Sequence, residues 1–320
     1  MSVPPFPRRV AILGSSGSIG RNALEVIAES EGRLEAVLLS VHRRTDILVE
    51  QIRQLAVRSV AEHIHAAEKN AIHPKITLPH WVVVTDETAD RTPLEDLPSD
   101  VKVFFGHDAL CQLVRQSEID IVLSAIVGSA GLTSTWSALE VGKMVALANK
   151  ESLVMGGSLI TDLAQKTGGL LIPVDSEHSA IMQSLQSWKM ESGLPESGTL
   201  ENLGNSESSG DSENSGNKIT SAENQNNQSP LSNLQSVIHK IILTASGGPF
   251  RSWTSEELAK VTVRDALVHP TWEMGKKITV DSATLMNKAL EIIEARWFFG
   301  IPVGKIEIVI HPQSIVHSMV

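Results

Sequence analysis

The fold class is decided by the stretch Arg9-Val10-Ala11-Ile12-Leu13-Gly14-Ser15-Ser16-Gly17-Ser18-Ile19-Gly20. Residues 9–13 form a short apolar run typical of a buried strand, and residues 19–30 have helical spacing. Glycines at every third position let the chain turn tightly and approach a pyrophosphate, while free amides at the helix start attract the anion. The stretch therefore predicts a dinucleotide-binding turn, with a purely structural turn as the alternative.

Further apolar runs follow at the spacing of an α/β sheet. They lie at residues 34–41, 82–84, 101–105, 119–125 and 144–148, separated by amphipathic stretches. Strands that alternate with helices predict a parallel, right-handed, doubly wound sheet of the Rossmann type. We expect a Rossmann-like domain at residues 1–152 and an α/β catalytic domain at residues 153–320.

Composition narrows the class of protein. The chain has 320 residues, is 42% hydrophobic, and has one cysteine and no apolar run long enough to span a bilayer. We expect a cytoplasmic protein that does not bind a membrane. Much of the formal charge of −10 comes from residues 191–236, which contain seven acidic residues and only one lysine. Their polar composition predicts a disordered insertion, and nothing in the rest of the chain indicates nucleic-acid binding.

A basic turn follows the second predicted strand. NAD sites usually carry an acidic residue at this place for the ribose hydroxyls, whereas this chain has His42, Arg43 and Arg44 there. Cationic side chains favour the 2′-phosphate of NADP. A solvated basic turn is the alternative.

Asn149, Lys150 and Glu151 follow the predicted strand at residues 144–148. This places them at the carboxyl edge of the sheet, where folds of this kind bind ligands, and makes Lys150 a candidate to contact substrate or nicotinamide. An ordinary helix start is the alternative, because Asn caps a first turn and Glu favours its dipole.

Acidic side chains at two places predict a metal site. Asp175 and Glu177 share one face if the strand at residues 170–174 continues through them, and Glu291 shares a helix face with Asn287 and Lys288. Oxygen ligands without cysteine or histidine suit Mg²⁺ or Mn²⁺ better than Zn²⁺. For Lys288 and Glu291 alone, an exposed ion pair is the alternative.

Two later segments complete the candidate residues. Ser246 lies in a glycine-rich turn that follows the apolar run at residues 241–243, and it could offer a hydroxyl to an anion. His269 and Trp272 lie in a loop that ends at Gly275. Trp272 is either a lid that excludes water or a half-buried surface anchor.

Taken in order, these motifs resemble those of the 1-deoxy-D-xylulose 5-phosphate reductoisomerase family. They are residues 14–20, 148–152, 174–180, 246–250, 269–275, 280–291 and 311–314. The resemblance runs from about Arg9 to the last residue, apart from the polar insertion. It implies isomerisation and reduction of 1-deoxy-D-xylulose 5-phosphate to 2-C-methyl-D-erythritol 4-phosphate, in isoprenoid synthesis. It also implies NADPH and Mg²⁺, Mn²⁺ or Co²⁺ as cofactors.

By motif position, the resemblance assigns a role to each candidate residue. Asp175, Glu177 and Glu291 would hold the metal and, with Lys150, would be the catalytic residues. The substrate would be contacted by Lys150, Ser176, Glu177, Ser246, His269, Trp272, Ser282, Asn287, Lys288 and Glu291. NADPH would be contacted by Ser16, Gly17, Ser18, Ile19, Asn149, Glu151 and Gly275, besides the basic turn of His42, Arg43 and Arg44.

The chain departs from the family pattern at three places. Arg44 stands where the family usually has Asn, the insertion replaces a shorter loop, and we expect this chain to lack the C-terminal helical domain that normally follows. We expect the family homodimer to be in doubt for this chain. A homologue that binds NADPH or a partner without turnover is one alternative, and another NADP-linked dehydrogenase on this scaffold is a second.

Overall fold

A computed structural model gives the fold and describes residues 7–69, 77–191, 238–272 and 274–320. The insertion predicted at residues 191–236 lies outside the described residues, apart from Glu191 at the end of a helix. Among the described residues, no helix combines the length and apolar character needed to cross a bilayer.

Within the described residues, seven parallel strands form the larger sheet, in the order β4-β3-β2-β1-β5-β6-β7. The strands are β1 (Arg8–Leu13), β2 (Leu34–Val41), β3 (Trp81–Val84), β4 (Lys102–Phe105), β5 (Ile121–Ser124), β6 (Met144–Leu147) and β7 (Leu170–Pro173). The chain winds outward from β1 in both directions, which confirms the doubly wound parallel sheet. The sheet continues past residue 152 to β7, and the predicted domain boundary at that residue stays a prediction.

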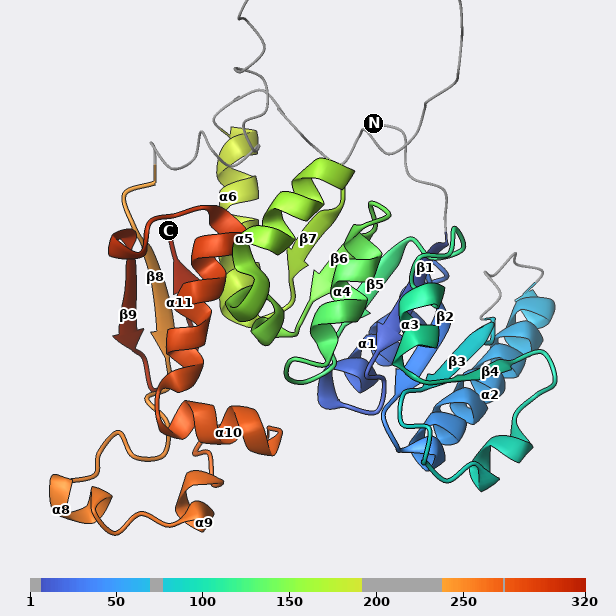
Figure 1. Ribbon diagram of the computed structural model, residues 1–320, viewed down its shortest axis with the longest axis horizontal. Coiled ribbons are helices and arrows are strands. Elements are labelled where there is room, and N and C mark those ends of the chain that lie inside the picture. The colour runs from blue at the N-terminus through green and yellow to red at the C-terminus, as the bar shows by residue number, and fades with distance from the viewer. Residues whose placement is uncertain (1–6, 70–76, 192–237, 273) are drawn as a thin grey trace, which may run out of the picture.

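Helices cover both faces of this sheet (Figure 1). They are α1 (Ser18–Ala28), α2 (Thr45–Lys69), α3 (His107–Leu113), α4 (Gly131–Leu139), α5 (Lys150–Thr167) and α6 (Ser176–Glu191), with a 3₁₀ turn, η1 (Thr92–Asp96). Strand alternation divides the core: Val10 and Ile12 pack in one cluster with apolar residues of α1 and α2, and Ala11 and Leu13 pack in the other with those of α3, α4 and α5.

The strand predicted at residues 170–174 does not continue through Asp175. β7 ends at Pro173 and α6 begins at Ser176, so Asp175 lies in the junction and Glu177 in the first turn of α6. The interpretation of these two carboxylates as alternate strand residues is therefore wrong, although a sharp strand-to-helix junction brings them together.

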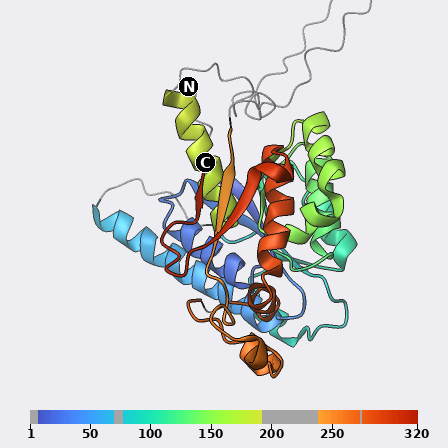
Figure 2. The same cartoon turned by 90° about the vertical axis from the view of Figure 1, so that its left-hand side faces the viewer.

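A smaller sheet of described residues has the order β10-β8-β9. Its strands are β8 (Ile241–Ala245), β9 (Ile306–Ile310) and β10 (Ser318–Met319). Short helices α8 (Ser255–Leu258), α9 (Val263–Ala266) and α10 (Lys276–Ala283) follow β8, then α11 (Met286–Phe299) and the turn η3 (Val303–Lys305). Figures 1 and 2 place α8 and α9 at the opposite end of the molecule from the last turn of α6.

Helix α11 joins the two sheets, because it packs on α5 and also contacts β8 and β9. The packing with α5 is close at Gly157, where a Cβ atom would lie 2.2 Å from the Trp297 indole nitrogen. This close approach holds the first residue of α5, Lys150, near the first turns of α11.

Candidate active site

The turn between β1 and α1 has the tight geometry that its glycines predict. Gly14 has φ of +85°, and a Cβ on Gly20 would lie 2.5 Å from the Gly14 carbonyl oxygen. Gly17 caps α1 without a side-chain hydrogen bond, and Gly17, Ser18 and Ile19 are exposed. The structure therefore brings the predicted Ser16–Ile19 segment to an open helix N-terminus of the kind that binds phosphate.

The basic turn lies beside this glycine turn, because the amides of Gly14 and Ser15 donate to the carbonyl of Ser40 at 3.1 and 2.8 Å. Within the turn, Arg43 pairs with Asp86, and Arg44 with Asp46 at 2.8 Å. His42 lies 3.1 Å from the Thr85 hydroxyl. All three basic side chains are exposed, and their partners come from the same rim of the sheet.

Six predicted residues converge at the carboxyl ends of β6 and β7. Lys150 begins α5, Asp175 and Glu177 lie at the β7–α6 junction, and Asn287, Lys288 and Glu291 lie on α11. The Lys150 ammonium donates to the Asp175 carboxylate at 3.0 Å and to the side-chain oxygen of Asn287 at 2.7 Å. The structure thus brings three distant stretches, residues 150, 175–177 and 287–291, together in one cluster.

A second lysine balances the same carboxylates. The Lys288 ammonium lies 2.7 Å from Glu177 and 2.6 Å from Glu291, and Asn287 donates from its side-chain amide to Glu291. Ser176 donates to the other Glu177 oxygen at 2.6 Å. Lys288 is 5% exposed and Glu291 1%. The exposed pair considered for these two residues is therefore wrong.

Burial and charge set the protonation of this cluster. Burial, together with the charges of Asp175 and Glu177, raises the pKa of Glu291 to about 7, although both lysines oppose the shift. Burial would lower the pKa of Lys150, but the negative charges of Asp175 and Glu291 outweigh it and raise that pKa. Burial would also raise the pKa of Asp175, but His178 and Lys150 hold it well below its usual range.

Two residues that the sequence analysis did not single out lie behind the cluster. His178 is fully buried; one ring nitrogen lies 2.9 Å from the Glu291 backbone carbonyl and the other 3.8 Å from Asp175. Burial raises the pKa of Glu294 to about 7. Burial alone would lower the pKa of His178, but Asp175 and Glu294 raise it to about 9. Their spacing, three residues after Asp175 and Glu291, is the signal that could have identified them.

The remaining predicted substrate residues form a neighbouring group. The Ser246 hydroxyl lies 3.1 Å from His269 Nε2, and the backbone amide of Trp272 donates to the other His269 nitrogen at 2.9 Å. A Cβ on Gly248 would lie 2.6 Å from the Ser282 carbonyl oxygen, so the turn after β8 packs closely on α10. The Trp272 side chain is 49% exposed, which fits either a lid or a surface anchor.

The remaining predicted cofactor residues link α5 to α10. Asn149 accepts a hydrogen bond from the Ser152 amide at 2.8 Å and donates to the Gly128 carbonyl at 2.8 Å, so it does cap α5. Glu151 pairs with Lys277 at 2.5 Å. Since Gly275 caps α10 just before Lys277, this ion pair holds Gly275 and the start of α10 against the start of α5.

The donor set fits a hard divalent cation. Asp175, Glu177 and Glu291 each offer a carboxylate oxygen, and these atoms lie within 4.8 Å of one another. The two buried ammonium groups of Lys150 and Lys288 already neutralise most of the negative charge of these carboxylates. A bound cation could neutralise the same charge in their place. Carboxylate-only donors suit Mg²⁺ or Mn²⁺.

Known proteins are similar in sequence to this chain over nearly its whole length. A 1-deoxy-D-xylulose 5-phosphate reductoisomerase from Rhodopirellula baltica is 40% identical over 330 residues, which cover 100% of this chain and 68% of that protein. The chain belongs to the 1-deoxy-D-xylulose 5-phosphate reductoisomerase family. The model of the family matches residues 10–77 and 71–157, and the model of its C-terminal domain matches residues 211–299.

This chain corresponds to only part of the length of other members of the reductoisomerase family. The Bacteroides fragilis enzyme is 41% identical over 98% of this chain but only 64% of its own length, so the chain spans about two thirds of such relatives. The Zymomonas mobilis reductoisomerase with NADPH is 34% identical and has a TM-score of 0.69, covering 98% of this chain and 64% of that one. A reductoisomerase complex with NADPH, fosmidomycin and magnesium is 32% identical with a TM-score of 0.71, covering 97% and 63%.

Proposed function

We propose that this chain carries the nucleotide, metal and substrate sites of a reductoisomerase. It would convert 1-deoxy-D-xylulose 5-phosphate to 2-C-methyl-D-erythritol 4-phosphate with NADPH and Mg²⁺ or Mn²⁺. The observation that carries this proposal is the convergence of Asp175, Glu177 and Glu291 with two buried lysines, on the carboxyl edge of a Rossmann-type sheet. Dimerisation and cytoplasmic location stay predictions.

The three carboxylates would hold the cation, which when bound would polarise the carbonyl and hydroxyl oxygens of the substrate. Lys150 stays charged and can donate hydrogen bonds to those oxygens from its place beside Asp175. Lys288 and Asn287 both contact Glu291 and can bind phosphate oxygens together with Ser246 and Ser282.

The nucleotide site would consist of two parts. The open N-terminus of α1 at Ser16–Ile19 would bind the pyrophosphate of NADPH, and Arg43 and Arg44 would exchange their carboxylate partners for the 2′-phosphate. Exchange costs little at Arg44, because both members of its pair with Asp46 are exposed and such pairs contribute only about 0 to 1 kcal/mol. Glu151 and Gly275 would flank the nicotinamide end, and Trp272 and His269 would close over the substrate.

The test uses the purified chain with substrate, NADPH and Mn²⁺, monitored at the nicotinamide absorbance band. We expect oxidation of NADPH that requires metal and is abolished in Glu177→Gln, which should keep NADPH affinity because the nucleotide site is separate. Glu307→Gln, which changes an exposed carboxylate paired with Lys240, is the matched control and should keep activity.

The outcomes separate the alternatives. NADPH binding without oxidation would favour a homologue that has no turnover. Oxidation that survives chelation of metal and loss of Asp175 would favour a different NADP-linked dehydrogenase. Equal loss of turnover and NADPH affinity in Glu177→Gln would mean that the carboxylate cluster is only structural.

A further inference from the structure

Helix α2 is bonded to the glycine turn through one side chain, Gln51. Its side-chain carbonyl accepts a hydrogen bond from the Ser15 hydroxyl at 2.8 Å, and its amide donates to the Ser15 backbone carbonyl at 2.7 Å. Gln51 is 6% exposed and Ser15 is fully buried. Two short, buried hydrogen bonds between the same two residues define the orientation of Ser15 closely.

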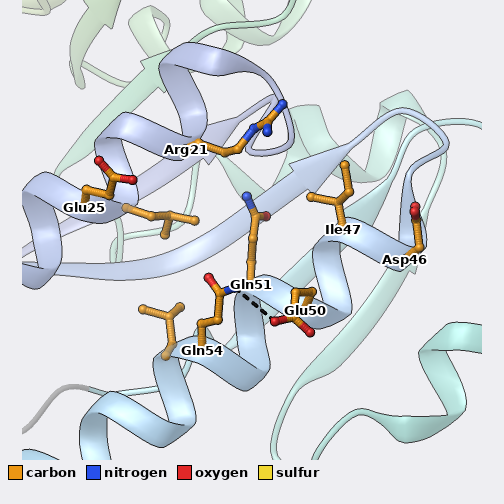
Figure 3. A pocket seen from close by; sticks show the side chains of 9 residues that line it. Arg21, Glu25, Asp46, Ile47, Glu50, Gln51 and Gln54 are labelled. Atoms are coloured by element: carbon orange, nitrogen blue, oxygen red, sulfur yellow. Dashed lines mark hydrogen bonds between the residues drawn. The ribbon is translucent and has the colours of Figure 1, made fainter.

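The surroundings of Gln51 distinguish it from the polar residues next to it. It lines a groove of about 430 Å³ between α1 and α2, together with Arg21, Glu25, Glu50 and Gln54. Figure 3 shows Gln51 pointing from α2 toward α1, whereas Gln54 bonds to Glu50 on its own helix. Gln54 is exposed and makes no hydrogen bond to the glycine turn among the bonds of the described residues.

The geometry of the peptide bond extends the effect of Gln51 to the next residue. In a planar trans peptide, the carbonyl of Ser15 and the N–H of Ser16 point in opposite directions. Because the Gln51 amide holds the Ser15 carbonyl toward α2, the Ser16 N–H must point away from α2. Ser16 is the first of the Ser16–Ile19 residues that form the open end of α1.

We propose that Gln51 is a positioning residue for the pyrophosphate of NADPH. It sets the direction of the Ser16 amide before the ligand arrives, so that binding does not have to order the turn. Since Arg43 and Arg44 immediately precede α2, the same bonds fix the spacing between the pyrophosphate site and the 2′-phosphate site. This inference rests on the proposed NADPH function and assigns part of that affinity to a residue outside the glycine motif.

The test compares four variants by NADPH titration and, for the separate carboxylate site, by Mn²⁺ titration. Gln51→Met keeps the approximate volume and removes both bonds, and Gln51→Glu keeps only the acceptor for the Ser15 hydroxyl. Gln54→Met and Gln54→Glu make the same changes one helical turn later in the same groove. We expect roughly tenfold weaker NADPH binding in both Gln51 variants, as one or two lost hydrogen bonds imply. Mn²⁺ affinity should not change in any variant.

Each outcome decides between the possibilities. Wild-type NADPH affinity in a folded Gln51→Met would overturn the positioning role, and parallel loss of NADPH and Mn²⁺ affinity would show that Gln51 only supports the fold. If Gln54→Glu and Gln51→Glu weaken NADPH binding equally, the added negative charge, and not the lost hydrogen bond, would explain the weaker binding. If Gln51→Met does not fold, Gln51→Glu carries the comparison. A wild-type chain that fails to bind NADPH would instead refute the proposed function, and this inference with it.

Discussion

Replacing Lys288 with methionine tests whether the buried carboxylates form a cation site. The substitution preserves most of the side-chain volume and removes the ammonium that lies 2.7 Å from Glu177 and 2.6 Å from Glu291. The remaining lysine of the cluster, Lys150, lies 3.7 Å from Glu291. Without metal, the variant therefore buries three carboxylates against one ammonium, which should destabilise the chain.

The structure sets the size of this loss. Removing one partner of a buried ion pair costs about 3 to 5 kcal/mol, and we expect about 3 kcal/mol because Lys150 supplies part of the countercharge and Glu177 is partly exposed. With about 2.1 cal/mol/K of unfolding entropy per residue, each kcal/mol lowers the Tm of this 320-residue chain by about 1.5 °C, so Tm should fall by about 4 to 5 °C. Mn²⁺ restores the missing positive charge, and it should raise Tm more in the variant than in the wild type.

The assay is thermal unfolding in chelator and in excess Mn²⁺. Lys240→Met is the matched control, because Lys240 pairs with Glu307 at the surface and such pairs contribute about 0 to 1 kcal/mol. An equal gain in Tm from Mn²⁺ in wild type and Lys288→Met would refute the idea that these carboxylates bind the ion. An unchanged Tm in chelator would refute the energetic argument for the buried pair.

Two further predictions concern pH and the glycine turn. Without metal, the free energy of unfolding should fall as pH rises from about 5 to 9. Glu291 and Glu294 keep a proton up to about pH 7 in the folded chain but lose it near pH 4.5 when unfolded, and the raised pKa of His178 extends the loss of stability to about pH 9. Denaturant titrations in chelator that show stability rising with pH would contradict this prediction. Gly20→Ala should destabilise the chain, because its Cβ would lie 2.5 Å from the Gly14 oxygen, whereas Gly17→Ala, at 3.4 Å, should mainly weaken NADPH binding; the reverse order in Tm and NADPH titrations would contradict the model of the turn.

The larger sheet could be predicted because its signals are local. Residues 34–41 were expected as a strand and form β2 with those bounds, and the runs at residues 144–148 and 101–105 form β6 and β4 to within one residue. The end of β7 could not be read in the same way. The apolar run through Val174 shows that a strand is present but not that it stops at Pro173, which depends on how α6 packs against β7 and β8.

The site was predictable where residue type alone carries the chemistry. Carboxylates and lysines at residues 150, 175, 177, 288 and 291 are rare in a core without a functional reason, and the structure brings them together, with Lys150, Lys288 and Glu291 buried. Contacts that depend on the three-dimensional course of the backbone cannot be recognised from residue type. The bonds of Gln51 to Ser15 and of His269 to Ser246 join residues whose types are common at surfaces, and only the fold shows that they meet.

The two lysines and the raised pKa of Glu291 describe a site that is already arranged for a cation. With Glu294 and the charged ring of His178 included, four carboxylates stand against three cations, which leaves one excess negative charge. Burial raises the pKa of Glu291 and so favours a proton there as the neutralising charge. A divalent ion entering the cluster would replace that proton and release Lys150 and Lys288 from their carboxylate partners. Both ammonium groups would then be free to bind anionic substrate oxygens, so metal binding and phosphate binding at this site should favour each other.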